Sequence, residues 1–171
     1  MKKIIFGLMA VCITGIACAQ KDVVSSVFEK YAGKEGFTTV NITGDMLNLV
    51  AHVEEQRRDT TFTSRLSEIK VLAVDKTCDK PAPAIDLRAE VYDKLDKSVY
   101  KEMISVKQND EDVVILAKEA NDRIAELLII VGGKDDNALI QVKGDMLLSE
   151  LAEMAGHYQV KGFEQLKKFE K

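Results

Sequence analysis

The chain has little of what metal sites and reactive sites are commonly built from. Its 171 residues include two His, three Cys, two Pro and no Trp. Neither His52 nor His157 has another His or Cys at the spacing of a metal-binding motif, so no metal site is predicted. A hydrophobic content of 46% with so little Pro excludes a disordered chain or a fibrous repeat and indicates a globular protein.

Cysteine is scarce in a way that also excludes disulfides. Cys12 and Cys18 lie in an N-terminal leader, which leaves Cys78 alone in the rest of the chain. A single cysteine cannot form an intramolecular disulfide. Cys78 stands in the polar segment DKTCDKPAP, where the sequence does not indicate the activating base that a nucleophilic thiol needs. We therefore assign no role to Cys78, His52 or His157.

An excess of positive charge is absent as well. The 24 basic and 28 acidic residues give a net charge of −4. Loss of residues 1–19 would remove two lysines, which leaves 24 − 2 = 22 basic and 28 acidic residues and a net charge of −6. Nucleic-acid binding needs clustered basic side chains that neutralise phosphates, so it is not predicted.

The common sequence signatures of enzymes are also missing. The chain contains no nucleophile elbow, P-loop, dinucleotide-binding glycine motif, HExxH zinc motif or EF-hand loop. The 28 acidic residues are dispersed, and two of them could still meet in the folded chain as a catalytic pair. The sequence therefore predicts no catalytic residue, cofactor or metal ligand.

The first feature that is present is an export leader. Two lysines precede an apolar run, residues 4–16, that is too short to span a bilayer. Two kinds of processing stay open. One is cleavage after Ala19. The other is a lipoprotein signal, with Cys18 retained and acylated, although Gly15 stands where Leu is usual. In either case the leader, residues 1–19, is excluded from the fold.

Residues 20–171 are predicted to form one α+β domain without a transmembrane span. The expected helices are 22–33, 45–58, 84–100 and 145–156, and the expected strands are 37–43, 66–75, 101–108, 112–119, 123–132 and 138–144. Short polar turns join the last four strands, which predicts an antiparallel meander. We expect one mixed, largely antiparallel sheet of about six strands with helices packed on one face. Residues 157–171 are expected to be a loose terminal helix or a frayed end.

The letters GDML occur twice, beginning at Gly44 and at Gly144. About 0.3 repeats of four residues are expected by chance in a chain of this length, so the identity alone does not show a duplication. In both places an alternating run precedes the motif and a helical pattern follows it. The motif therefore predicts two strand-to-helix corners, in which Gly allows the tight turn and Asp45 or Asp145 caps the helix. We favour this interpretation over an active site that pairs Asp45 with Asp145.

The leader, the length, the GDML helix entries, IKVLAVD (residues 69–75) and ALIQVKGDM (residues 138–146) together resemble the family called domain of unknown function 4252. The resemblance implies an exported cell-envelope protein of Bacteroides type, and several members are described as lipoproteins. It implies a location in the periplasm or at the outer membrane, either soluble after cleavage or held by a lipid on Cys18. It brings no activity, cofactor or catalytic residue.

Three functional hypotheses follow. The first is a non-enzymatic envelope protein that binds a partner or regulates a neighbour; a deep pocket of polar groups with shifted pKa values would oppose it. The second is a hydrolase with dispersed carboxylates, which two acidic side chains facing each other across a cleft would favour. The third is a carrier of an apolar ligand on the concave face of the sheet, which a filled sheet–helix interface would exclude.

Overall fold

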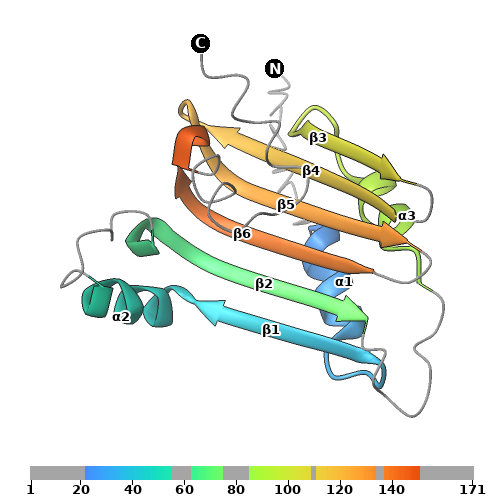
Figure 1. Ribbon diagram of the computed structural model, residues 1–171, viewed down its shortest axis with the longest axis horizontal. Coiled ribbons are helices and arrows are strands. Elements are labelled where there is room, and N and C mark those ends of the chain that lie inside the picture. The colour runs from blue at the N-terminus through green and yellow to red at the C-terminus, as the bar shows by residue number, and fades with distance from the viewer. Residues whose placement is uncertain (1–21, 55–62, 75–84, 109–110, 134–136, 151–171) are drawn as a thin grey trace, which may run out of the picture.

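One open antiparallel sheet organises the structure. The computed structural model describes residues 22–54, 63–74, 85–108, 111–133 and 137–150. Six strands lie in the order β1-β2-β6-β5-β4-β3 (Figure 1). Their bounds are β1 Phe37–Thr43, β2 Leu66–Val74, β3 Tyr100–Gln108, β4 Glu111–Ala120, β5 Arg123–Gly133 and β6 Ala138–Met146.

The predicted α+β class and the C-terminal meander are confirmed. β3, β4, β5 and β6 pair in chain order, and a turn with positive φ at Asn121 and Asp122 joins β4 to β5. β2 pairs with β1 on one side and with β6 on the other. Every neighbouring pair is antiparallel, so the sheet contains no parallel pair among the described strands.

Two helices cover one face of the sheet, which we call the helix-covered face. They are α1 (Val23–Tyr31) and α3 (Leu87–Glu90), which lie behind the sheet in Figure 1. The buried cluster between these helices and the sheet consists of Val24, Val27, Phe28, Tyr31, Leu72, Leu87, Val91, Leu95, Tyr100, Val114, Leu116, Leu128, Ile130 and Leu139. Side chains fill this interface, which argues against an apolar ligand held between α1 and the sheet.

The start of α1 explains why it forms where the sequence predicted it. Asp22 precedes the helix, and its carboxylate accepts a hydrogen bond from the N–H of Ser25 at 3.3 Å. The Tyr31 hydroxyl donates to Glu90 at 2.6 Å, and Nζ of Lys30 lies 2.8 Å from the same carboxylate. These contacts tie the end of α1 to α3.

The helix predicted over residues 84–100 is much shorter than expected. It consists of α3 and the 3₁₀ turn η3 (Tyr92–Lys94), and its inward residues Leu87, Val91 and Leu95 are buried as the pattern indicated. The Asp96 side chain accepts from both the N–H and the hydroxyl of Ser98, at 2.8 and 2.6 Å. Such local hydrogen bonds compete with helix continuation, and the chain turns into β3.

The third helix lies at one end of the sheet. α2 (Gly44–Glu54) follows β1, and Leu47 on its inner side joins a second buried cluster on the opposite face. The other buried members of that cluster are Leu66, Ile115, Ala117, Ile124, Leu127 and Met146. Among the described helices, none combines the length and the apolar character that crossing a bilayer requires.

Candidate functional site

A row of polar side chains crosses the helix-covered face at one level of the sheet. Five residues on five neighbouring strands are successive cross-strand partners: Tyr100 on β3, Lys118 on β4, Glu126 on β5, Lys143 on β6 and Glu68 on β2. We call these five residues the polar row. From β4 to β2 the charges alternate in sign, so neighbouring side chains attract one another.

The row keeps the regular register of the sheet, and two irregularities lie directly beside it, at Leu66 and Ile124. The register between β2 and β6 shifts between Leu66 and Glu68, and the register between β5 and β6 shifts between Ile124 and Glu126. Leu66 and Ile124 belong to the cluster on the opposite face, whereas Glu68 and Glu126 are both cross-strand partners of Lys143. Bulges are frequent beside functional sites.

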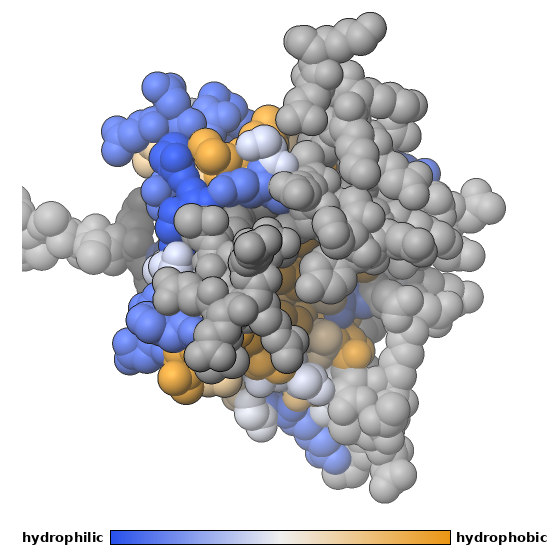
Figure 2. All heavy atoms as spheres, turned by 60° about the vertical axis from the view of Figure 1, so that its left-hand side comes forward, coloured by the Kyte–Doolittle hydropathy of each residue, from blue (hydrophilic) through white to orange (hydrophobic). Residues whose placement is uncertain are grey.

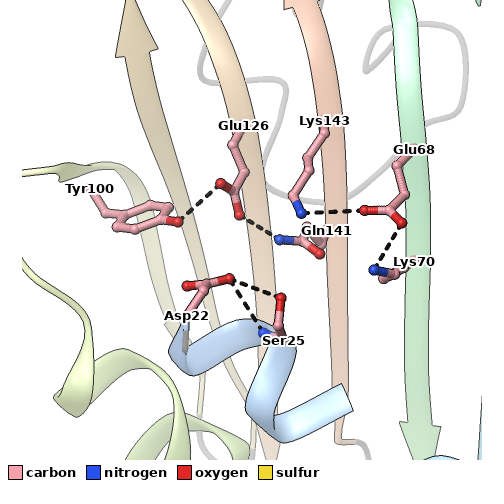
Figure 3. A network of polar contacts seen from close by, with 8 residues as sticks. All are labelled: Asp22, Ser25, Glu68, Lys70, Tyr100, Glu126, Gln141 and Lys143. Atoms are coloured by element: carbon pink, nitrogen blue, oxygen red, sulfur yellow. Dashed lines mark hydrogen bonds and ion pairs between the residues drawn. The ribbon is translucent and has the colours of Figure 1, made fainter. Parts of the chain in front are cut away.

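Glu126, in the middle of the row, is a buried carboxylate held by neutral donors. Its side chain accepts hydrogen bonds from the Tyr100 hydroxyl at 3.0 Å and from Nε2 of Gln141 at 2.6 Å (Figure 3). Glu126 is 6% exposed and Gln141 is 0% exposed. Oε1 of Gln141 has no hydrogen-bond partner among the described residues. Buried polar groups of this kind carry a desolvation cost, so packing alone does not explain them.

Tyr100 is held in its neutral form. Burial is the main cause that raises the pKa of Tyr100 above its ordinary value of 10.0, and the charge of Glu126 and the hydrogen bond to it raise the pKa further. The charge of Asp22 acts in the same direction. At neutral pH Tyr100 is therefore a donor to Glu126 and not a proton acceptor.

Glu68, at the other end of the row, lies between two lysines. Its carboxylate is 2.8 Å from Nζ of Lys70 and 3.3 Å from Nζ of Lys143 (Figure 3). Burial alone would raise the pKa of Glu68, but the hydrogen bonds and charges of the two lysines outweigh it and lower the pKa below 4.5. Lys143 pairs with Glu68, and among the described residues it forms no ion pair with Glu126.

The first turn of α1 faces the polar row. The carboxylate of Asp22 accepts from the N–H and the hydroxyl of Ser25, both at 3.3 Å. Figure 3 shows this turn beside Tyr100 and Glu126. The positive end of the helix dipole favours negative charge there, which suits the carboxylates of Asp22 and Glu126.

A cavity of about 910 Å³ opens at this end of the helix-covered face. Its lining includes Tyr100, Lys118, Glu126 and Lys143 of the polar row. The other charged residues of the lining are Asp22, Arg65, Lys94, Asp96 and Asp145. Cavities of several hundred cubic ångströms hold small ligands, and this one offers acidic and basic groups in equal number among the described residues.

The two GDML segments have different structures. α2 begins at Gly44, so the predicted helix is present there, with Asp45 in its first turn. The capping role of Asp45 stays a prediction. Gly144 and Asp145 instead lie within β6, which continues to Met146. The prediction of a helix entry at Gly144 and Asp145 is therefore wrong, because the pairing of β6 with β2 and β5 extends through this segment.

The helix expected after the second motif begins later. Residues 148–150 are helical, and the N–H of Leu147 donates to the carboxylate of Glu150 at 2.9 Å. Glu150 thus supplies the capping interaction that was expected from Asp145. The remainder of that predicted helix and the expected terminal tail lie outside the described residues.

Both motif glycines allow a close approach to β2. A Cβ on Gly144 would lie 2.6 Å from the carbonyl oxygen of Arg65, and one on Gly44 would lie 3.0 Å from that of Ser67. Neither glycine has a positive φ, so the tight-turn explanation does not apply. The two motifs lie on opposite sides of the start of β2. Gly stands at both positions because the backbone of β2 and of the residue before it occupies the space that a side chain would need.

The remaining residues considered from the sequence do not form a site in the described structure. His52 is exposed on α2, with Nδ1 2.7 Å from the carbonyl oxygen of Asn48. Cys18, Cys78 and His157 lie outside the described residues. In the part of the chain that the structure describes, no group of three His, Cys, Asp or Glu is placed to hold a metal ion.

Sequence reasoning missed the polar row. A signal was present, because Glu126 interrupts the apolar strand RIAELLIIVG, and Gln141 and Lys143 interrupt ALIQVKG at alternate positions. Alternate residues of a strand share a face, so each strand taken alone predicts a polar end on one face. The convergence of these ends depends on the strand order, which inserts β6 between β2 and β5.

The fold and the site together define an α+β domain with one antiparallel sheet and a cavity, with charged side chains in its lining, at one end of its helix-covered face. The chain belongs to the family Domain of unknown function (DUF4252), whose family model matches residues 31–154. The match confirms the resemblance seen in the sequence and includes Glu68, Tyr100 and Glu126. Neither the curated proteins nor the solved structures contain a match to the chain.

Proposed function

We propose that this protein is a non-enzymatic binding module of the cell envelope and that the cavity at the polar row holds its ligand. The observation that carries the proposal is Glu126, a buried carboxylate in a largely apolar strand at the wall of a cavity. Burying a charge disfavours folding unless it is compensated, and such residues are concentrated at functional sites.

The charges of the cavity favour a small zwitterionic ligand, such as an amino acid or a short peptide. Glu126 faces the cavity, and among the described residues no cation is paired with it. Lys118, its cross-strand neighbour, also has no ion-pair partner in the described part of the chain. A ligand ammonium group at Glu126 and a ligand carboxylate at Lys118 would satisfy both charges.

The state of the polar row supports binding over proton transfer. Both hydrogen bonds to Glu126 come from groups that remain neutral at physiological pH. The pKa of Tyr100 is raised, which moves its titration further from neutrality. A general acid or base works best when its pKa lies near the working pH, and Tyr100 is shifted in the opposite direction.

A ligand screen tests the proposal. The midpoint of thermal unfolding is measured with a panel of free amino acids and short peptides, and the best ligand is then titrated calorimetrically. Glu126→Gln should weaken its binding by about tenfold or more, because the charged hydrogen bond is lost. The control is Glu119→Gln, which removes a surface carboxylate paired with Lys101. Equal affinities in both variants would contradict the proposal.

A hydrolase is the second candidate, because Asp22 and Glu126 line the same cavity. Two carboxylates at one cavity are the minimum for general acid–base hydrolysis. Under this alternative the best ligand of the screen is consumed, and turnover disappears in both Asp22→Asn and Glu126→Gln. A ligand recovered intact after prolonged incubation would support binding alone.

The envelope location is tested separately at Cys18. Palmitate labelling of the protein in its native host compares the original chain with Cys18→Ala, with and without globomycin. Label that depends on Cys18 identifies a lipid-anchored protein. Absence of label, together with a mature N-terminus at Gln20, identifies cleavage after Ala19. Retention of the intact leader would contradict the export proposal.

A further inference from the structure

The two edge strands of the sheet, β3 and β1, differ in how they are protected against pairing with a further strand. β3, at one edge, carries Lys101 and Lys107, and its register with β4 shifts between Glu102 and Ile104. β1, at the other edge, has the sequence FTTVNIT and forms seven consecutive cross-strand pairs with β2 without a shift. Exposed edges usually carry charge, Pro or a bulge, because their unpaired backbone groups recruit further strands. β3 has two of these protections, and β1 has none.

The β1 edge is also open to solvent. Residues 38–41 are exposed, and Val40 has 42% of its surface accessible. Within the described part of the chain, β2 is the only strand that pairs with β1, which forms the lower border of the sheet in Figure 1. β1 therefore offers a regular, uncharged strand edge to an additional strand.

We infer that β1 is a dimerisation edge, at which two copies of this chain pair their β1 strands antiparallel around a two-fold axis at Val40. In this register Thr38 lies opposite Ile42 of the second copy, and Thr39 lies opposite its Asn41. At the two-fold axis a residue faces its own copy, so a charge at that position would meet a like charge. β1 carries no charge, which makes it compatible with its own copy.

Apolar surface next to β1 supports the same partner. In the antiparallel arrangement, α2 of one copy lies near the start of β1 of the other. Met46 and Leu49 on α2 are 52% and 62% exposed, and Figure 2 shows hydrophobic residues on the surface at this end of the molecule. A second copy would cover part of this surface. Partners of another kind are commonly selected by complementary charge, which β1 does not provide.

Sedimentation equilibrium of the protein purified after full-length expression tests the inference. The original chain should form a concentration-dependent dimer. Val40→Lys should weaken the dimer by about fivefold or more, because two lysines then face each other at the axis. Ser105→Lys, which adds the same charge to the β3 edge, should leave the dimer unchanged. A monomer at all concentrations in the original chain, or equal weakening by Ser105→Lys, would overturn the inference.

Two further measurements separate pairing from misfolding. An equimolar mixture of Val40→Lys and Val40→Glu should restore the dimer, since opposite charges then meet; a mixture that stays monomeric overturns the register. In a Cys78→Ser background, Val40→Cys should give a disulfide-linked dimer on mild oxidation, because identical residues face each other at the axis. Cys78→Ser alone is the control, and no cross-linking above its level also overturns the inference.

Discussion

The helix-covered face has two parts that are built on the same strands and differ in kind. On β5, Leu128 belongs to the buried apolar cluster, and Glu126 belongs to the polar row. On β6, Leu139 belongs to the cluster, and Gln141 donates to Glu126. In both strands the face changes within two positions. It is apolar and covered by helices at the leucine, and it is polar and borders the cavity at the next residue on the same side.

The two parts have different roles: the apolar part stabilises the fold, and the polar row exposes functional groups to the cavity. Burial of a leucine side chain contributes about 1.5–3 kcal/mol, so the apolar part accounts for stability. A buried carboxylate with neutral partners contributes little net stability and often less than an apolar residue of similar volume. The polar row therefore serves something other than folding, and we connect it with ligand binding.

The largest expected effect is in the apolar part. Leu128→Ala should reduce the free energy of unfolding by about 2–5 kcal/mol, because Leu128 is fully buried and its loss leaves a cavity. Urea unfolding followed by circular dichroism measures the change. A loss below that range would mean that the apolar part is less closely packed than the comparison requires.

The next effect concerns the backbone that borders the polar row. Gly144→Ala should destabilise the protein by about 1–3 kcal/mol, because the new Cβ would meet backbone atoms of Arg65 and Leu66 at 2.6 and 2.8 Å. Gly44→Ala is the matched control, with its nearest contact at 3.0 Å and a helical position that favours Ala. Equal losses in urea unfolding would contradict the close approach that we assign to Gly144.

Tyr100→Phe should lower the free energy of unfolding by about 1–2 kcal/mol at pH 7, because Glu126 loses one of its donors. The raised pKa of Tyr100 also predicts a pH effect. The stabilisation that comes from neutral Tyr100 is fully present below pH 10, the pKa of tyrosine in the unfolded chain. It is lost as the pH rises through the higher pKa that Tyr100 has in the folded protein. Stability measured from pH 8 to 11 should therefore fall less in the variant than in the original chain. The pKa of Tyr31 is also raised, so some loss should persist.

Glu68→Gln should have a small effect, about 1 kcal/mol or less at pH 7, because the ion pairs of Glu68 are partly exposed. The pKa of Glu68 is lowered, so its contribution is present above pH 4.5 and is lost as pH falls through the lower folded value. Unfolding measured between pH 3 and 7 should show the two proteins converging at acid pH. A difference that stays constant would mean that charge is not the cause.

The strands could be predicted from the sequence because each carries its own signal. Alternation located all six strands, and the short polar segments between the last four predicted their order. The position of β2 could not be predicted, because its pairing with β6 joins residues that lie far apart in the chain. The polar row depends on that pairing, which has no local signature in the sequence.

The GDML segments show the limit of local patterns more directly. The same four residues begin a helix at Gly44 and extend a strand at Gly144. Burial is reversed too, since Met46 is exposed and Met146 is buried. Tertiary pairing decides the outcome at the second site, because β5 and β2 lie on both sides of β6.

The most direct test of the central claim is the stability and ligand response of the triple variant Tyr100→Phe, Glu126→Leu and Gln141→Leu. Replacing all three residues together leaves no polar side chain of the trio buried without its partner. Such a joint replacement by apolar residues is often neutral or stabilising. We predict that the variant unfolds at the same denaturant concentration as the original chain, or at a higher one, and loses the stabilisation by the ligand. A strong loss of stability, or an unchanged ligand response, would contradict the assignment of the polar row to binding.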